Sequence, residues 1–178
     1  RGEESIRDEQ FVRQLAQDWG MPLEVIRVDT HAYAVEHKCS VQIAARQIRY
    51  DWFDELLAAK QQAGERFFLA TAHHADDNLE TFIINLTRGT GLDGLTGIPE
   101  ENDKIIRPLL PFSREEILKY AEENKIEWRE DSSNASNKYL RNKIRHDLVP
   151  ILKEINPNFL NAFQKTQSYL HESKEMVE

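Results

Sequence analysis

Cysteine is almost absent from this sequence: Cys39 is the only one, so the chain cannot close a disulfide within itself. The first residues also lack the basic, apolar and small-residue segments of a secretory signal peptide. These two absences argue against the class of secreted proteins that are held together by disulfides. They predict a protein of the reducing cytoplasm.

Long hydrophobic runs and an excess of positive charge are missing as well. No apolar run approaches the roughly 18 residues that a membrane-spanning helix needs, so we expect no membrane partner. The 31 acidic residues outnumber the 23 Lys and Arg, for a net charge of -8, which argues against a protein that coats nucleic acid non-specifically. A local basic face can still bind RNA. With 178 residues, 40% of them hydrophobic, the chain can bury a core.

The first half of the chain alternates between helical and strand patterns. Helical periodicity predicts helices over 5–19, from Ser40 to a point before Gly64, and over 75–88. β-branched and apolar runs predict strands over 23–28 and 66–71, the second buried on both faces of a parallel sheet. Strands that alternate with helices indicate right-handed βαβ units. The predicted fold class is therefore α/β, with part of a doubly wound parallel sheet.

The second half is expected to be helical. The extended run 105–110 contains Pro108, which excludes it from a central strand position. A capping box at Ser113 opens a helix that ends near Asn124, and a polar loop covers 130–137. A helix over 138–149 should stop at Pro150, and a last helix should start at 156–157. We therefore expect one domain over 1–112 and an all-helical segment over 113–178.

Ionisable side chains gather where the strand 66–71 meets the helix 75–88, in the segment ATAHHADDNLETF. On a helix that begins near Ala75, His73, Asp77 and Glu80 lie at i, i+4 and i+7, with Asp76 one turn before Glu80. Ligands of open α/β sheets bind beyond the carboxyl ends of strands. The cluster could hold Mg²⁺ together with phosphates, or the ammonium group of an amine substrate.

Two other interpretations of this cluster remain open. The acids could do no more than complement the helix dipole, with the histidines filling space. The His-His and Asp-Asp pairs could instead be ligands of a metallohydrolase, although no further His or Cys stands nearby at ligand spacing. The segment GTGLDG, 89–94, matches a dinucleotide-binding pattern but follows a helix. We expect Gly89 to cap that helix and Gly91, Gly94 and Gly97 to form a loop rather than an NAD site.

The motifs TAHHADDNLETFIINLTRGTGLDGLTGIP, RPLL, SREEILKY, DSSN and YLRNKIRHDLVP follow one another along nearly the whole chain. In this order they resemble the tRNA(Ile)-lysidine synthetase family, a branch of the PP-loop ATP pyrophosphatases. The resemblance implies an adenine nucleotide alpha hydrolase-like, Rossmann-like catalytic fold. Asn78 stands where the family more often has Gln, and the family's Ser-Gly-Gly-x-Asp-Ser phosphate loop is absent. These features predict a fragment that is inactive alone, from a parent with further tRNA-binding domains.

The reaction implied by the resemblance joins L-lysine to C2 of the wobble cytidine of tRNA(Ile), using ATP and Mg²⁺ through an adenylated tRNA. The residues expected at the reacting centre are Asp77, Glu80, His73 and Arg49. Those expected to bind ATP or the substrate are His74, Asp76, Arg88, Gly89 and Gly91. Mg²⁺ is expected on Asp76 or Asp77. For Arg49, an ordinary solvated helix arginine is an equally good interpretation.

One short helix carries a concentration of positive charge within this acidic chain. Its four cations flank the apolar row Leu140, Ile144 and Leu148 and are Lys138, Arg141, Lys143 and Arg145. From the sequence alone, an amphipathic helix with solvated charges is the simpler interpretation. With the resemblance, these residues become candidates for binding tRNA phosphates, and Arg141 and Arg145 could also contact ATP.

Two rival functions belong to other classes. A related PP-loop ATP pyrophosphatase could modify a different substrate, although a sulfur-transferring member would need more cysteines than Cys39. A non-catalytic RNA-binding module would keep the basic helix but would have no use for the acids at 76, 77 and 80. A sheet edge left open by missing strands would also favour a homodimer.

Overall fold

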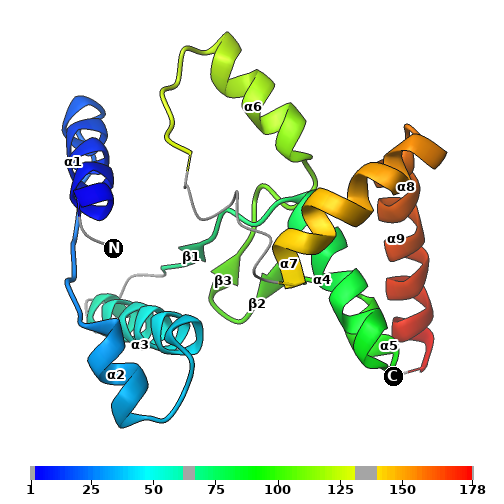
Figure 1. Ribbon diagram of the computed structural model, residues 1–178, viewed down its shortest axis with the longest axis horizontal. Coiled ribbons are helices and arrows are strands. Elements are labelled where there is room, and N and C mark those ends of the chain that lie inside the picture. Colours follow the sequence, from blue (N-terminus) through cyan, green and yellow to red (C-terminus); the bar gives the residue numbers. More distant parts are fainter. Residues whose placement is uncertain (1–2, 62–66, 131–139, 178) are drawn as a thin grey trace. The chain divides into compact units, whose positions relative to one another are not determined.

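The computed structural model describes residues 3–61, 67–130 and 140–177, and it divides into two compact units, Arg1–Glu65 and Arg66–Glu178 (Figure 1). The domain boundary expected after residue 112 stays a prediction. Within the described ranges, no helix combines the length and the hydropathy that crossing a membrane requires.

The first unit contains three helices, α1 (Glu3–Asp18), α2 (Thr30–Glu36) and α3 (Val41–Gln61). The sequence predicted α1 and α3 but not α2. The start of α2 is fixed by Asp29, whose carboxylate accepts hydrogen bonds from the amides of His31 and Ala32, both at 3.0 Å. An aspartate in this position satisfies amides that the first helical turn leaves without partners.

The strand predicted over 23–28 is wrong. The segment forms no strand, and its apolar side chains Leu23, Val25, Ile26 and Val28 are between 37% and 46% exposed. A strand is stabilised by hydrogen bonds to a neighbour, and the pairs in the described ranges involve other segments. The β-branched composition of 23–28 therefore does not produce a strand here.

The second unit contains a small mixed sheet with the order β1-β3-β2, built from β1 (Leu69–Ala70), β2 (Glu101–Asn102) and β3 (Ile105–Ile106). β1 pairs with β3 in parallel, as predicted, but β2 pairs with β3 antiparallel across a tight hairpin turn. The strand predicted over 66–71 is shorter, and it is not buried on both faces, because Phe68 and Ala70 are exposed. In the described ranges β1 has a partner strand on one edge only, which leaves it less covered.

The prediction that Pro108 keeps the run 105–110 out of a central strand position is wrong for its first two residues, because Ile105–Ile106 form β3 in the middle of the sheet. β3, the middle strand of the three, stops at Ile106, and a turn follows in which the amide of Leu110 donates to the carbonyl of Arg107 at 3.1 Å. Pro108 lies in this turn and not in the strand, because it has no amide hydrogen to give to a sheet.

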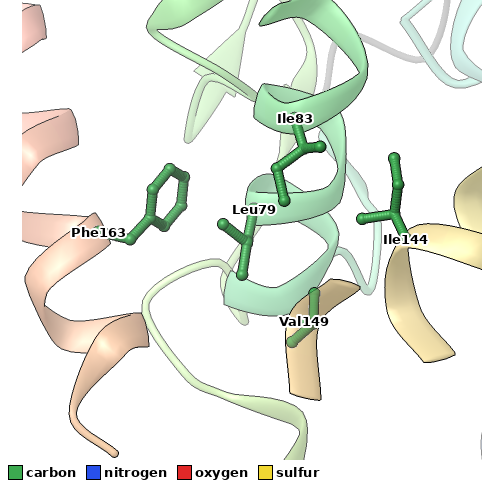
Figure 2. Close-up of a cluster of buried hydrophobic side chains, with 5 residues drawn as sticks. All are labelled: Leu79, Ile83, Ile144, Val149 and Phe163. Atoms are coloured by element: carbon green, nitrogen blue, oxygen red, sulfur yellow. The ribbon is translucent and has the colours of Figure 1, made fainter. Parts of the chain in front are cut away.

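The core of the second unit forms around α4 (Ala75–Arg88), which has the predicted bounds. Leu79 and Ile83, one turn apart on α4, pack against Ile144, Val149 and Phe163 (Figure 2). Phe82 adds an edge-to-face contact with Phe163, with ring centroids 5.2 Å apart. Because later helices pack against α4 along its length, the polar residues at its N-terminus are held on a rigid element.

The helix predicted to stop at Pro150 continues past it. α7 (Leu140–Lys143) leads through a π-helical turn, η2 (Ile144–Leu148), into α8 (Val149–Ile155). The amide of Val149 bonds to the carbonyl of Ile144, five residues back, and Pro150 then stands in the first turn of α8, where no amide hydrogen is needed. The π turn and the start of α8 at Pro150 together explain why the helical path continues past the proline.

The remaining helices agree with the sequence more closely. α6 (Arg114–Glu123) starts at the predicted Ser113 capping box, and α9 (Phe159–Val177) follows the predicted 156–157 start. Gly89 caps α4 as expected, with a positive φ of 72°. The loop predicted after it contains a short helix, α5 (Leu92–Leu95), which begins after Gly91.

Gly97 brings the chain back against the start of α4. Its φ is 76°, and a Cβ at this position would collide with the side chain of Asn78. That side chain in turn accepts a hydrogen bond from the amide of Ile98 at 2.7 Å. Glycine is required here both for the backbone conformation and for the close approach.

Candidate functional site

The N-terminus of α4 is closed by its own polar side chains. His74 is the N-cap, and its amide donates to Asp77 Oδ2 at 3.1 Å, while the amide of Asp77 donates to His74 Nδ1 at 3.4 Å. The His74 Nε2 atom is 3.4 Å from Asp77 Oδ2. This reciprocal cap fixes the direction in which the Asp77 carboxylate points.

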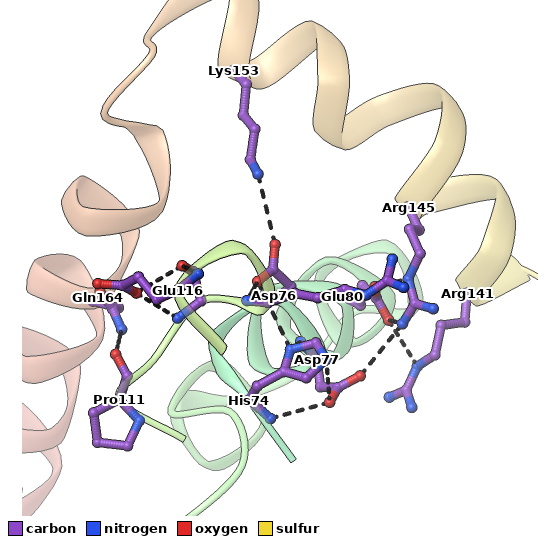
Figure 3. Close-up of polar contacts among 12 residues, drawn as sticks. His74, Asp76, Asp77, Glu80, Pro111, Glu116, Arg141, Arg145, Lys153 and Gln164 are labelled. Atoms are coloured by element: carbon purple, nitrogen blue, oxygen red, sulfur yellow. Dashed lines mark hydrogen bonds and ion pairs between the residues drawn. The ribbon is translucent and has the colours of Figure 1, made fainter. Parts of the chain in front are cut away.

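A buried acid one turn further along α4 anchors an arginine from η2. The Arg145 guanidinium donates from Nε to Glu80 Oε1 at 2.6 Å and from Nη2 to Glu80 Oε2 at 3.1 Å, a two-pronged pair (Figure 3). Its Nη2 is also 3.4 Å from Asp77 Oδ1. The Glu80 side chain is 1% exposed and that of Arg145 is 22% exposed. Two-pronged geometry makes this pair strong and directional.

Burial and charge oppose each other at this pair. Burial raises the pKa of Glu80 above its ordinary value, while the hydrogen bond and charge of Arg145 act in the opposite direction. Burial disfavours ionisation of Arg145, but the hydrogen bond and charge of Glu80, with the charge of Asp77, raise its pKa above the ordinary value. Arg145 therefore favours the charged form of Glu80 against the effect of burial.

The second arginine of the basic helix also faces α4. Arg141, one helical turn before Arg145, donates from Nη2 to Thr81 Oγ1 at 2.7 Å, and its Nε is 3.5 Å from Glu80 Oε2. The side chain of Arg141 is 42% exposed, about twice the exposed fraction of Arg145. The i, i+4 spacing predicted for this helix thus places both guanidinium groups against one face of α4.

Asp76 connects α4 to two further helices. Its Oδ2 accepts a hydrogen bond from the amide of Arg114 at 2.8 Å, at the start of α6. Its Oδ1 is 3.7 Å from Nζ of Lys153 on α8 (Figure 3). The side chain of Asp76 is 17% exposed, so part of the carboxylate remains open to a ligand.

A pocket of about 850 Å³ opens in front of this acid, between α4, α6 and α8. We call it the α4–α6–α8 pocket. Charges of both signs line it, among them Asp76, Glu80, Arg114, Lys119, Arg145 and Lys153. Its size falls in the range of small-molecule sites. An arrangement of this kind suits a ligand that carries an ammonium group at one end and anionic groups at another.

The other residues predicted for this site lie in different places. His73 shares a hydrogen bond with Thr71 Oγ1 at 2.9 Å, at the end of the β1 segment. Arg88 is the last residue of α4, about 20 Å from the first by the helical rise, and Gly89 and Gly91 follow it. Arg49 is exposed on α3, in the first unit. The geometry thus brings together Asp76, Asp77 and Glu80 with His74.

The cations of the predicted tRNA-binding helix do not all have the same surroundings. Arg141 and Arg145 face the acids of α4, whereas Lys143 is exposed to solvent. Lys138 lies outside the described residues. The charges that the sequence placed together on one helix therefore differ in their surroundings.

Sequence reasoning missed three groups of the site: Lys153, Thr81 and the backbone amide of Arg114. Lys153 and the Arg114 amide reach the cluster through packing between helices that are distant along the chain, and Thr81, on α4 itself, joins it through Arg141, 60 residues away. Lys153 follows Pro150, where the helix was expected to have ended. No local pattern signals contacts across 38 or more residues.

The protein side chains alone offer few ligands for a metal ion. In the described ranges, no group of three or more His, Cys, Asp or Glu side chains is arranged to hold a metal. Both oxygens of Asp77 have partners, whereas Oδ1 of Asp76 faces only Lys153 at 3.7 Å among its recorded ion pairs. Mg²⁺ needs one or two carboxylates when phosphates supply further ligands. Asp76 fits that arrangement better than Asp77.

Comparison with known proteins gives this geometry a family context. A family model described as a PP-loop domain matches residues 2–152. The chain is 45% identical to a tRNA(Ile)-lysidine synthase of Bacteroides thetaiotaomicron over 97% of its own length, and 47% identical to one of Porphyromonas gingivalis over 96%. Over the whole length of the present chain, the identity to the tRNA(Ile)-lysidine synthase of Chlorobaculum tepidum is 39%.

The chain spans only part of these relatives. It covers 39% of the Bacteroides protein, 37% of the Porphyromonas protein and 53% of the Chlorobaculum protein.

Proposed function

Because this chain belongs to the PP-loop domain family, we propose that it forms part of an ATP-dependent tRNA(Ile)-lysidine synthase. The reaction joins the ε-amine of L-lysine to C2 of the wobble cytidine in a CAU anticodon. The C2 oxygen first attacks the α-phosphate of ATP and releases pyrophosphate. The amine then attacks C2, AMP leaves, and the nitrogen loses a proton.

One observation carries this proposal: the α4–α6–α8 pocket offers carboxylates and cations to the same ligand. Lysine has a cationic ε-ammonium and an anionic carboxylate, so it can meet both. We place the ε-ammonium at Asp76, the partly open acid, and the lysine carboxylate toward Lys153 or Lys119 on the other walls. A rival with an uncharged substrate would have less use for such a lining.

The lysine ε-ammonium must lose a proton before its nitrogen can attack, so a nearby carboxylate must accept that proton. Asp76 lines the pocket and its side chain is 17% exposed, so it is the group we expect to accept a proton near the nucleophile, with Asp77 beside it in the first turn of α4. Glu80 is almost completely buried, and we assign it the positioning of Arg145. Arg145 would then direct its guanidinium at the phosphate of the adenylated intermediate.

ATP and Mg²⁺ remain parts of the proposal. Mg²⁺ would neutralise phosphate charge, and Asp76 or Asp77 would supply its protein ligand, with Asp76 the better fit. Arg49 and His73 stay candidates for the reacting centre, and Arg88, Gly89 and Gly91 for binding ATP or the substrate. Lys138, Arg141, Lys143 and Arg145 stay candidates for tRNA. Cytoplasmic location and a homodimer are likewise predictions.

A chimera tests the proposal. This chain would replace the matching 172 residues of the Bacteroides tRNA(Ile)-lysidine synthase. Incubated with ATP, L-lysine and tRNA(Ile), the chimera should convert the wobble cytidine to lysidine, detected by mass spectrometry of the nucleosides. A folded chimera that binds ATP but modifies a different base, or consumes a different amine, would replace this assignment by that of a related PP-loop enzyme.

A further inference from the structure

A second pocket lies on the opposite side of α4 from the candidate site, against α9. It has a volume of about 620 Å³ and is bordered by the turn around Pro99, the segment 110–111 and one face of α9. The face of α9 is continuous, because its lining residues 164, 167, 168, 171, 172 and 175 follow helical spacing. None of the residues assigned to catalysis or to substrate lines it. We call it the α9 pocket.

The amides and hydroxyl in the α9 pocket each use one donor on the protein itself. Gln164 Nε2 donates to the carbonyl of Pro111 at 2.8 Å (Figure 3), and Gln167 Nε2 donates to the carbonyl of Leu95 at 2.7 Å. The hydroxyl of Ser168 donates to the carbonyl of Lys165 at 3.0 Å. Each amide nitrogen keeps one further N–H, and the oxygen atoms of these side chains are acceptors.

One of these acceptors is buried without a partner. Gln167 is 5% exposed, and its Oε1 has no hydrogen-bond partner. Gly97 lies beside this oxygen, and a Cβ on Gly97 would be only 3.0 Å from it. An unsatisfied buried acceptor is costly, so the site favours a ligand that brings a donor.

Three carboxylates stand at the rim of the same pocket: Glu100, Glu172 and Glu175, all exposed. Among the lining residues in the described ranges, none is Lys or Arg. His171 also lines it, so a ligand there meets three carboxylates, amide oxygens and one imidazole. Metal ions fit poorly, because no described group of three or more acidic, His or Cys side chains is arranged for one.

We propose that the α9 pocket binds a free alkylammonium ion of the polyamine class. An ammonium group offers three donors and no acceptor, which complements Gln167 Oε1, and further ammonium groups of the same molecule meet the rim glutamates. An amino acid such as lysine suits the pocket less well, because its carboxylate would face the same acids. This inference goes beyond the proposed reaction and does not depend on it.

Calorimetric titration of the chain with spermidine, without ATP or tRNA, tests the proposal. The double change Glu172→Gln with Glu175→Gln should weaken binding by about tenfold, because it removes two charge pairs from exposed positions. The matched control is Glu24→Gln with Glu36→Gln, which removes the same charge from exposed positions in the first unit and should leave the affinity unchanged. Gln167→Leu, which removes the buried acceptor, should also weaken binding, and circular dichroism checks its fold.

Each outcome decides the question. Equal weakening by both double variants would mean diffuse attraction to an acidic protein and would overturn the proposal, as would no saturable binding at all. Tighter binding of L-lysine than of spermidine at this pocket would overturn the polyamine assignment. If Gln167→Leu does not fold, the glutamate pair alone decides. Loss of lysidine formation in the chimera, with spermidine binding intact, would count against the proposed function only.

Discussion

Glu80→Gln should lower the rate of lysidine formation by the chimera about 100-fold, an effect of the size seen when one preorganised polar group is removed from an active site. Glutamine keeps the shape of the side chain but removes the charge to which Arg145 is bound at 2.6 and 3.1 Å. The guanidinium then keeps at most a neutral hydrogen bond to the amide oxygen, and Asp77, at 3.4 Å, is the carboxylate that still pairs with it. We expect kcat to fall while the KM for lysine changes little, because Glu80 positions Arg145 and does not itself receive the amine.

The control for this variant is Glu154→Gln. Glu154 lines the same pocket and is exposed, so its loss changes the local charge without touching Arg145. A purely structural role for Glu80 would lower the amount of folded protein and leave the kcat of the folded fraction unchanged. Restoration of part of the activity by Glu80→Asp, which returns the charge, would support the positioning role. Unchanged kinetics in Glu80→Gln would remove Glu80 from the site.

Arg145→Met should destabilise the chain by about 3 kcal/mol at neutral pH, because it leaves the Glu80 carboxylate buried without its main partner. The effect should depend on pH. Arg145 opposes the rise in the pKa of Glu80 that burial causes, so its removal raises that pKa further. When folding raises the pKa of a carboxyl group, the folded state loses stability as the pH increases through the folded-state pKa.

The destabilisation by Arg145→Met should therefore be small near pH 4, where Glu80 is protonated in both proteins, and should grow toward pH 8. Urea unfolding of both proteins at several pH values measures it. Arg141→Met is the matched control, since Arg141 is 42% exposed and 3.5 Å from Glu80, and it should cost less than about 1 kcal/mol. A destabilisation by Arg145→Met that is equal at pH 4 and pH 8 would contradict the pairing.

The sequence predicts α4 and its acids well, for local reasons. The apolar spacing of Leu79 and Ile83, the acids of the first turn and the cap at Gly89 all lie within one segment. Each of these signals depends on neighbours along the chain, so a single sequence suffices. The same holds for the Ser113 capping box at the start of α6.

What the sequence does not predict depends on contacts between distant segments. The pairing of Arg145 with Glu80 spans 65 residues, and no spacing rule reports it. The apolar segment 23–28 has the composition of a strand, but a strand also needs a partner to pair with. The helix path continues beyond Pro150 because a π turn precedes it, and this places Lys153 beside Asp76.

The basic helix shows how the two kinds of information combine. Its charge and its apolar row are visible in the sequence, which left both a tRNA contact and a solvated face open. The fold adds that Arg145 and Arg141 face carboxylates of α4. Their positive charge is therefore partly neutralised within the protein before any nucleic acid arrives.

The central claim is that the α4–α6–α8 pocket holds an amine substrate through Asp76. Calorimetric titration of the chain with L-lysine, with EDTA and without nucleotide, tests it apart from any role of Asp76 toward Mg²⁺. Asp76→Asn should weaken lysine binding by about tenfold, whereas Asp93→Asn, a change at an exposed acid on α5, should not. Saturable binding that is lost only in Asp76→Asn is the predicted result. Equal affinity in the unchanged protein and Asp76→Asn, or binding lost equally in both variants, would contradict the account.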